Sequence, residues 1–253
     1  LDLFVEDGRS GSISELEINK LFLELEDSLG LIKNKNNSLE VDLLELKFFY
    51  IKGRYHIREG KYKEGLEDIE FVIRKAKNLN VRDYILMGYK QMIFYNIQKN
   101  KPLEMKKFVE DSIELAVESN YHKEISALLR LKGLNNMMLG NYEEAEKFLR
   151  ESIFSFEITN SLANEYAINI AAAYNYIGEL KYAQRDLLGS IDEYEKAISL
   201  SKGKSAYSSL AIFYLNMGKA YFTLDIKKSK EYFNLAKEQY KERKSFWKLS
   251  VLD

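Results

Sequence analysis

The chain has 253 residues, no cysteine, one proline and a formal net charge of −1. The lack of cysteine excludes disulfide and thiolate chemistry, and the near-neutral charge gives no overall attraction to nucleic acid or to an anionic membrane. A single proline fits long helices, because proline interrupts helix interiors. No apolar run reaches the roughly 20 residues that a membrane-spanning helix needs. Because no signal peptide is visible either, we expect a cytoplasmic protein.

Residues 1–38 are predicted to form an N-terminal linker and a capping helix. The Gly/Ser-rich run EDGRSGS is typical of a turn or linker. Ser14 and Glu17 have the spacing of a capping box that opens a helix, and Gly30 lies near its end. The apolar stripe of this helix consists of Leu16, Leu21, Leu25 and Leu29. The run KNKNN at 33–37 is predicted to be a polar loop.

Residues 39–241 are predicted to form five helix pairs joined by short loops, as expected for antiparallel neighbours. The first helices are expected over 39–58, 82–99, 122–139, 162–184 and 205–223. The second helices are expected over 62–78, 103–119, 142–158, 187–201 and 227–241. Residues 242–253, which contain Phe246, Trp247 and Leu249, form either a capping helix or a truncated sixth repeat. Both ends of the chain look cut from a longer protein.

One packing pattern recurs along these helices. Each second helix has a stripe at i, i+4 and i+7, as in Ala145, Leu149 and Ser152. Successive stripes end at positions that lie 40, 40, 45 and 39 residues apart, namely Val72, Ser112, Ser152, Ala197 and Ala236. The first helices carry a glycine where two helices must approach closely, at Gly53, Gly133, Gly178 and Gly218. A two-helix unit with this period predicts an all-α fold, an α-solenoid of helix–turn–helix repeats.

The repeat resembles the tetratricopeptide (TPR) motif over residues 40–240. The second repeat is degenerate, because Ile93 replaces the glycine and Pro102 the loop aromatic. The best match is the third repeat, with Gly133, Gly140, Tyr142 and Ala145. A period near 40 rather than about 34 residues is similar to the TPR-like domains of bacterial transcription regulators and peptide-pheromone receptors. The resemblance implies a right-handed superhelix whose glycine-bearing first helices line the concave side.

The chain offers little for catalysis. We expect His56 to be a partly buried packing residue and His122 to be a surface or capping residue. No histidine, cysteine or carboxylate group has the spacing of a metal site. The run GRSGS is not a phosphate loop, because no Lys-Ser/Thr follows it and no strand precedes it. We therefore predict no catalytic residue, no metal and no cofactor, and a protein that is not an enzyme.

The ligand-facing positions of TPR first helices, projected onto this chain, give a candidate peptide- or partner-binding face. It combines cations, amides and aromatic rings: Tyr50, Arg54, Arg58, Lys90, Gln91, Phe94, Arg130, Leu134, Asn175, Tyr176, Glu179, Asn216 and Lys219. An asparagine amide can both donate to and accept from a peptide backbone, and an arginine can hold a carboxylate with two bonds. The alternative is that these are ordinary solvated residues. The carboxylate clamp of chaperone-binding TPRs is not reproduced, because Tyr50 and Arg54 stand where that motif has Lys and Asn.

These observations predict a non-catalytic, protein- or peptide-binding module of a larger cytoplasmic bacterial regulator. Two alternatives stay open: the sensing domain of a peptide-pheromone-type receptor, and a structural scaffold that self-associates. We expect no direct binding to nucleic acid and no membrane partner. A homodimer formed through a terminal helix also stays open.

Overall fold

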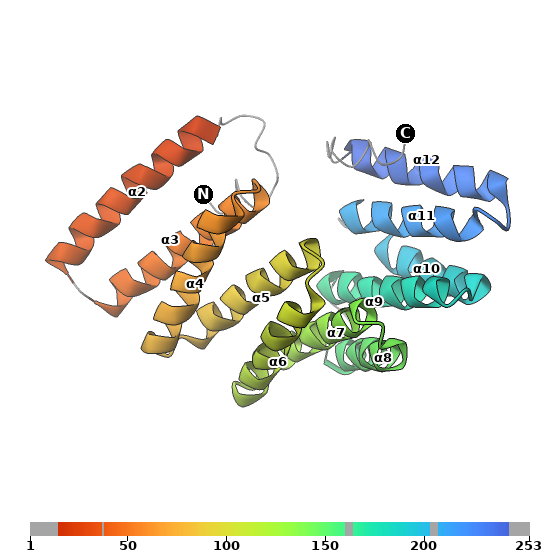
Figure 1. The fold of residues 1–253 in the computed structure, drawn as a ribbon, viewed down its shortest axis with the longest axis horizontal. Coiled ribbons are helices and arrows are strands. Elements are labelled where there is room, and N and C mark those ends of the chain that lie inside the picture. The colour runs from red at the N-terminus through yellow and green to blue at the C-terminus, as the bar shows by residue number, and fades with distance from the viewer. Residues whose placement is uncertain (1–14, 37, 160–163, 203–206, 243–253) are drawn as a thin grey trace. The chain divides into compact units, whose positions relative to one another are not determined.

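The computed structural model describes residues 15–36, 38–159, 164–202 and 207–242. Within these ranges the chain forms eleven helices and no strand, so the predicted all-α fold is confirmed (Figure 1). The helices are α2 (Glu15–Lys35), α3 (Leu39–Arg58), α4 (Tyr62–Leu79), α5 (Arg82–Gln98), α6 (Pro102–Glu118), α7 (His122–Met138), α8 (Tyr142–Thr159), α9 (Asn164–Ala183), α10 (Leu187–Ser201), α11 (Tyr207–Tyr221) and α12 (Ile226–Glu242).

The chain divides into two compact units, residues 1–115 and 116–253. The first unit has a core that contains the fully buried Leu46, Ile69 and Val72. Cores of the second unit contain Leu149 and Ile177 in one cluster and Tyr194 and Met217 in another, together with their neighbours Ala173, Ala197 and Ala236. The stripe positions among these residues are buried, as the repeat pattern predicts. None of the described helices is both long and apolar enough to cross a membrane.

The turns between helices repeat every 20 residues over the first half of the chain. Gly60 and Gly140 have φ values of 82° and 81°, in the left-handed region that favours glycine. Between them, the same conformation recurs at Asn80, Asn100 and Asn120. At each of these residues a helix ends, and backbone hydrogen bonds close its last turn. After Gly60, for example, Lys61 N–H donates to the His56 carbonyl at 2.8 Å. This regular helix ending sets the length of each half-repeat.

Glycine lets the two helices of a repeat approach closely. A Cβ atom added to Gly133 on α7 would lie 2.6 Å from Leu149 Cγ and 3.1 Å from the Ala145 carbonyl oxygen, both on α8. Ala145 and Leu149 are fully buried. The same contact recurs in the next two repeats, where a Cβ would meet the Tyr194 ring from Gly178 and the Phe233 ring from Gly218. The predicted close approaches at these glycines are therefore present.

The degenerate second repeat has its close approach elsewhere. Ile93 is fully buried on α5, where the other repeats have glycine. Gly88, five residues earlier, is where a Cβ would collide with the side chain of Ile73 on α4. The tight contact here joins α5 to the second helix of the preceding repeat rather than to its own partner α6.

Helix α2 differs from its prediction in two ways. It continues to Lys35, so the polar loop predicted at 33–37 is wrong for residues 33–35. Its predicted apolar stripe is largely exposed, since Leu16 is 80% exposed and Leu21 and Leu25 are each 40% exposed. The residue that anchors α2 is Phe22, whose ring centroid lies 5.5 Å from that of Tyr55 on α3. Ser14 of the predicted capping box and the C-terminal residues Phe246, Trp247 and Leu249 lie outside the described residues.

Candidate functional site

The first helices of successive repeats lie next to one another within each unit. In the second unit α7 contacts α9, and α9 contacts α11. Five predicted site residues on these helices form what we call the polar row: Arg130 on α7, Asn175, Tyr176 and Glu179 on α9, and Asn216 on α11. The i, i+4 spacing puts Asn175 and Glu179 on one side of α9. Asn216 lies 41 residues after Asn175, which is one repeat period.

Two amides converge on one carboxylate in the polar row. Asn175 Nδ2 donates to Glu179 Oε1 at 2.6 Å, and Asn216 Nδ2 donates to the same oxygen at 2.9 Å. Asn216 Nδ2 also donates to Asn175 Oδ1 at 3.0 Å. Asn175 is only 3% exposed and Asn216 only 7%. The bonds between neighbouring repeats hold these side chains in fixed orientations.

Glu179 has a raised pKa. Burial is the main cause, because it disfavours the charged carboxylate. The two asparagine donors and the positive charge of Lys219 act in the opposite direction. Lys219 itself is exposed and forms no ion pair with Glu179 in the described part of the chain. Among the described residues, the carboxylate therefore has hydrogen-bond donors but no direct cationic partner.

Arg130 is a half-buried cation with few partners. One terminal nitrogen donates to Asn169 Oδ1 at 3.3 Å, and its Nε atom is buried with no hydrogen-bond partner. No carboxylate among the described residues lies within ion-pair distance of it. Burial lowers the pKa of the guanidinium, and the nearby Tyr176 opposes this. Burial raises the pKa of Tyr176, which interacts with both Arg130 and Glu179.

The predicted site residues of the first unit form a separate, smaller cluster. Gln91 Nε2 on α5 donates to the hydroxyl of Tyr50 on α3 at 3.2 Å, and these residues are again 41 apart. The Arg54 guanidinium lies 5.4 Å from the centre of the Tyr50 ring. Phe94 is 44% exposed, while Lys90 is half-buried. In both units, side chains of neighbouring first helices therefore pair with each other, but the paired residue types differ.

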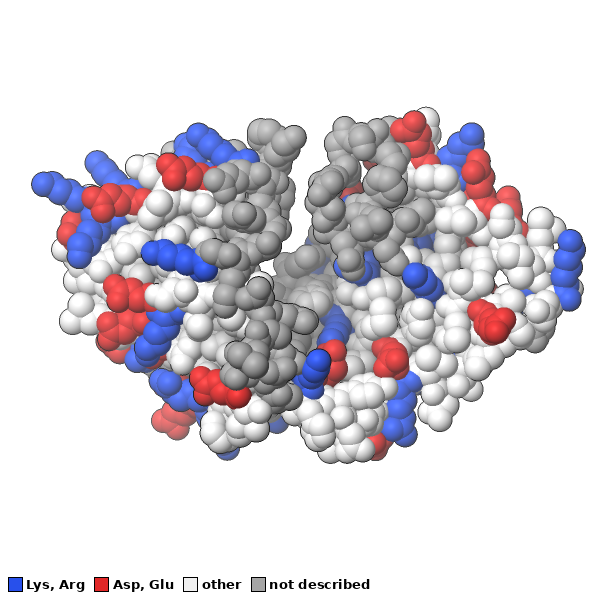
Figure 2. Space-filling view, turned by 180° about the vertical axis from the view of Figure 1, so that it is seen from behind, with Lys and Arg blue, Asp and Glu red and all other residues white. Residues whose placement is uncertain are grey.

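Two further predicted site residues have local roles. Arg58 is exposed, and its Nε lies 3.4 Å from Glu59 Oε1. Leu134 is 6% exposed, so its side chain contributes mainly to packing. Over the face drawn in Figure 2, acidic and basic side chains are interspersed. Recognition on such a surface depends on individual groups rather than on a field of one sign.

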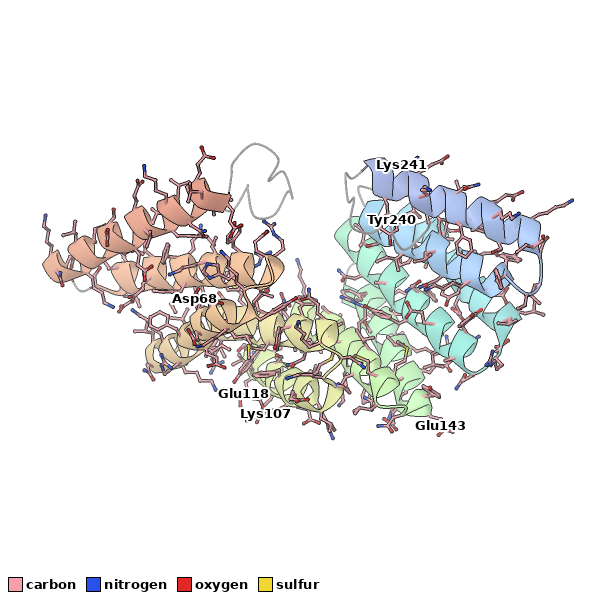
Figure 3. All side chains as sticks on the ribbon, turned by 45° about the horizontal axis from the view of Figure 1, so that its top comes forward. Asp68, Lys107, Glu118, Glu143, Tyr240 and Lys241 are labelled. Atoms are coloured by element: carbon pink, nitrogen blue, oxygen red, sulfur yellow. The ribbon has the colours of Figure 1, made fainter. Side chains whose placement is uncertain are left out.

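His56 is buried and has an acidic partner. Its Nδ1 atom lies 3.3 Å from Oδ2 of Asp68, a residue of α4 labelled in Figure 3. Burial lowers the pKa of His56 and raises the pKa of Asp68 to about 6. His122 is exposed at the first position of α7. The described residues contain no cluster of three histidine or carboxylate side chains that could hold a metal ion.

The Asp68 carboxyl is expected to make stability depend on pH. Its pKa is about 6 in the folded chain against the ordinary 3.8, so acidification from pH 7 to 5 protonates the folded state but not the unfolded state. That raises the free energy of unfolding by about 1 kcal/mol. His56 acts oppositely, because its lowered pKa leaves the unfolded state more protonated. Urea denaturation should thus show that the free energy of unfolding of wild type rises relative to that of Asp68→Asn by about 1 kcal/mol between pH 7 and pH 5. A difference between the two proteins that is the same at both pH values would contradict the assignment.

No family model matches the chain, and no curated protein matches it. Solved structures do match. A Rap protein complexed with competence and sporulation factor has a TM-score of 0.73 at 13% identity, over 92% of this chain and 62% of that one. NprR in complex with its cognate peptide NprX has a TM-score of 0.70 at 15% identity, over 91% and 66%.

A third structure carries the repeat explicitly. The TPR-like repeats of a putative kinesin light chain from Podosopora anserina have a TM-score of 0.57 at 15% identity, over 79% of this chain and 96% of that one. At these identities the likeness shows the fold, which is a TPR-like solenoid as predicted. The chain spans less than two-thirds of the length of the Rap and NprR chains.

Proposed function

We propose that this chain is the peptide- or protein-binding module of a larger cytoplasmic bacterial regulator, and that it binds its partner without catalysing a reaction. The observation that carries the proposal is the polar row. Its amides, cation and carboxylate come from the first helices of three successive repeats. An extended segment lying across those helices would reach the partly exposed Arg130, Tyr176 and Glu179, which the buried amides of Asn175 and Asn216 support from below. Residues of this kind can bind both the backbone and the charged groups of a peptide.

The alternative of a peptide-sensing domain has its own support. Two of the structures with the same fold are complexes, one of NprR with its cognate peptide NprX and one of a Rap protein with competence and sporulation factor. We propose a short peptide as the first ligand class to test on this chain, ahead of a folded protein.

The scaffold alternative rests on α2. This helix exposes Leu16, Leu23 and Leu31, which are 80%, 65% and 64% exposed. Apolar side chains on one exposed helix are typical of a surface that another chain covers. Sedimentation of the isolated chain distinguishes the readings, because a scaffold self-associates at micromolar concentration without any ligand.

The proposal is tested with single charge reversals, one in each unit. Arg130→Glu should abolish capture of peptide or protein partners from a bacterial lysate if the second unit binds them, and Arg54→Glu should do so if the first unit does. Arg74→Glu on α4 is the matched control, because Arg74 is exposed and lies on a second helix. Partners are identified by mass spectrometry, and circular dichroism checks folding. Equal recovery by all variants would move the site off the first helices.

A further inference from the structure

Arg130 carries a charge that the described chain does not balance. Its Nε atom is buried without a hydrogen-bond partner, and its groups within reach are neutral: the amide of Asn169 at 3.3 Å and the side chain of Tyr176. A buried cation is costly unless an anion pairs with it. The guanidinium fork fits the two oxygens of a carboxylate well. A ligand carboxylate would therefore supply the anionic partner that Arg130 lacks among the described residues.

The other end of the polar row offers acceptors. Asn216 Nδ2 donates to both Asn175 and Glu179, so its Oδ1 is left to accept. Glu179 receives both of its hydrogen bonds on Oε1. No described residue donates a hydrogen bond to its Oε2 atom. An incoming ligand meets an acid and a carbonyl here, which favours an ammonium or guanidinium group.

A third residue, Tyr176, is near both ends. It interacts electrostatically with both Arg130 and Glu179. Tyr176 and Glu179 are three residues apart on α9, which is about 4.5 Å along the helix axis. The cationic and anionic ends of the polar row thus lie on different repeats, on helices that contact each other.

We infer that the polar row selects ligands by charge order: a carboxylate binds at Arg130, and a basic group of the same ligand binds at Glu179 and Asn216. The ligand class is a short peptide with an acidic and a basic residue close together, oriented with its acidic residue at α7 and its basic residue toward α11. This inference rests on the proposed function, and it adds a composition and a direction to the peptide.

The experiment uses a random hexapeptide pool. The full chain is immobilised, incubated with the pool, and the retained peptides are sequenced by mass spectrometry. Wild type should enrich peptides that contain both an acidic and a basic residue. Arg130→Gln should lose the enrichment of acidic residues and keep that of basic residues, and Glu179→Gln should do the reverse. Each selected peptide should bind about tenfold more weakly to the variant that lacks its partner.

The controls separate failure of this inference from failure of the proposed function. Arg150→Gln removes an exposed cation outside the polar row and should leave the selection unchanged. Arg130→Lys keeps the charge but loses the fork, so it should retain acidic enrichment at reduced affinity. If wild type retains no peptide, the peptide-binding form of the proposed function is wrong, and the lysate capture then tests the protein-binding form. If it retains peptides with no charge preference, or with a preference that neither variant alters, only the charge-order inference is overturned.

Discussion

Replacing Gly65 with alanine is expected to lower the free energy of unfolding by about 1–3 kcal/mol. Gly65 lies on α4 where that helix crosses α3. An added Cβ would lie 2.8 Å from the Ile57 backbone nitrogen and 2.9 Å from the Gly53 carbonyl oxygen. Because these are backbone atoms of α3, they cannot rotate away as a side chain could. The two helices must separate, and the buried Ile69 and Val72 on α4 would lose contact with α3.

A matched glycine provides the control. Gly30 lies inside α2, and no neighbouring atom lies within 4 Å of where an added Cβ would stand, so Gly30→Ala should gain up to about 1 kcal/mol from helix propensity. Urea denaturation followed by circular dichroism measures both variants. We expect Gly65→Ala to lower the free energy of unfolding and Gly30→Ala to raise it. A general effect of replacing glycine with alanine would not produce both results. A Gly65→Ala protein as stable as wild type would mean that α3 and α4 do not meet at these glycines.

The repeat pattern predicts the fold because the same steric requirement recurs in each unit. Gly133, Gly178 and Gly218 all face a large side chain of the partner helix, and spacing alone locates them. The half-repeat is also visible in the sequence, since an asparagine stands 20 and 40 residues after Gly60, at positions 80 and 100. Asparagine tolerates the left-handed conformation, so it marks the same turn as glycine. The pattern does not locate Gly88, because Gly88 contacts a helix of the preceding repeat rather than the partner helix of its own repeat.

Helix α2 shows a limit of sequence periodicity, which predicts a helix but not its contacts. A stripe of leucines predicts a helix, but it does not say whether another element covers the stripe. Among the described helices α2 contacts only α3. The polar run after Gly30 is typical of a loop, yet Lys33 Nζ pairs with Glu45 on α3 at 2.9 Å. This tertiary ion pair and the favourable position of lysines at a helix C-terminus extend the helix.

Sequence spacing predicts which candidate residues lie on neighbouring helices, but not the contacts that they make. The repeat period aligns Asn175 with Asn216, and Tyr50 with Gln91, so the sequence can place each pair on neighbouring helices. Side-chain distances decide the rest. Glu179 accepts hydrogen bonds from two amides, whereas no acid among the described side chains pairs with Arg130, and neither fact follows from spacing. Because these hydrogen-bond and charge partners are distributed unequally, the two ends of the polar row differ in charge, and the row has a direction.

Acidification is expected to weaken binding of the selected peptides that carry a basic residue, by about tenfold between pH 8 and pH 5. The ionised Glu179 attracts the basic group, and protonation removes that attraction. Because burial raises the pKa of Glu179, the loss begins at a higher pH than it would for an ordinary glutamate. A bound cation lowers that pKa again, so peptide binding and proton release are linked.

Fluorescence anisotropy with a labelled, histidine-free peptide measures this effect. Wild type should lose affinity as the pH falls, whereas Glu179→Gln should bind weakly and with little pH dependence. A peptide whose basic residue is replaced by norleucine serves as the second control, because it has no cation for Glu179 to attract. Circular dichroism at each pH verifies that the chain stays folded. An equally steep pH dependence in Glu179→Gln would assign the titration to another group, and the basic residue of the peptide would then bind away from Glu179.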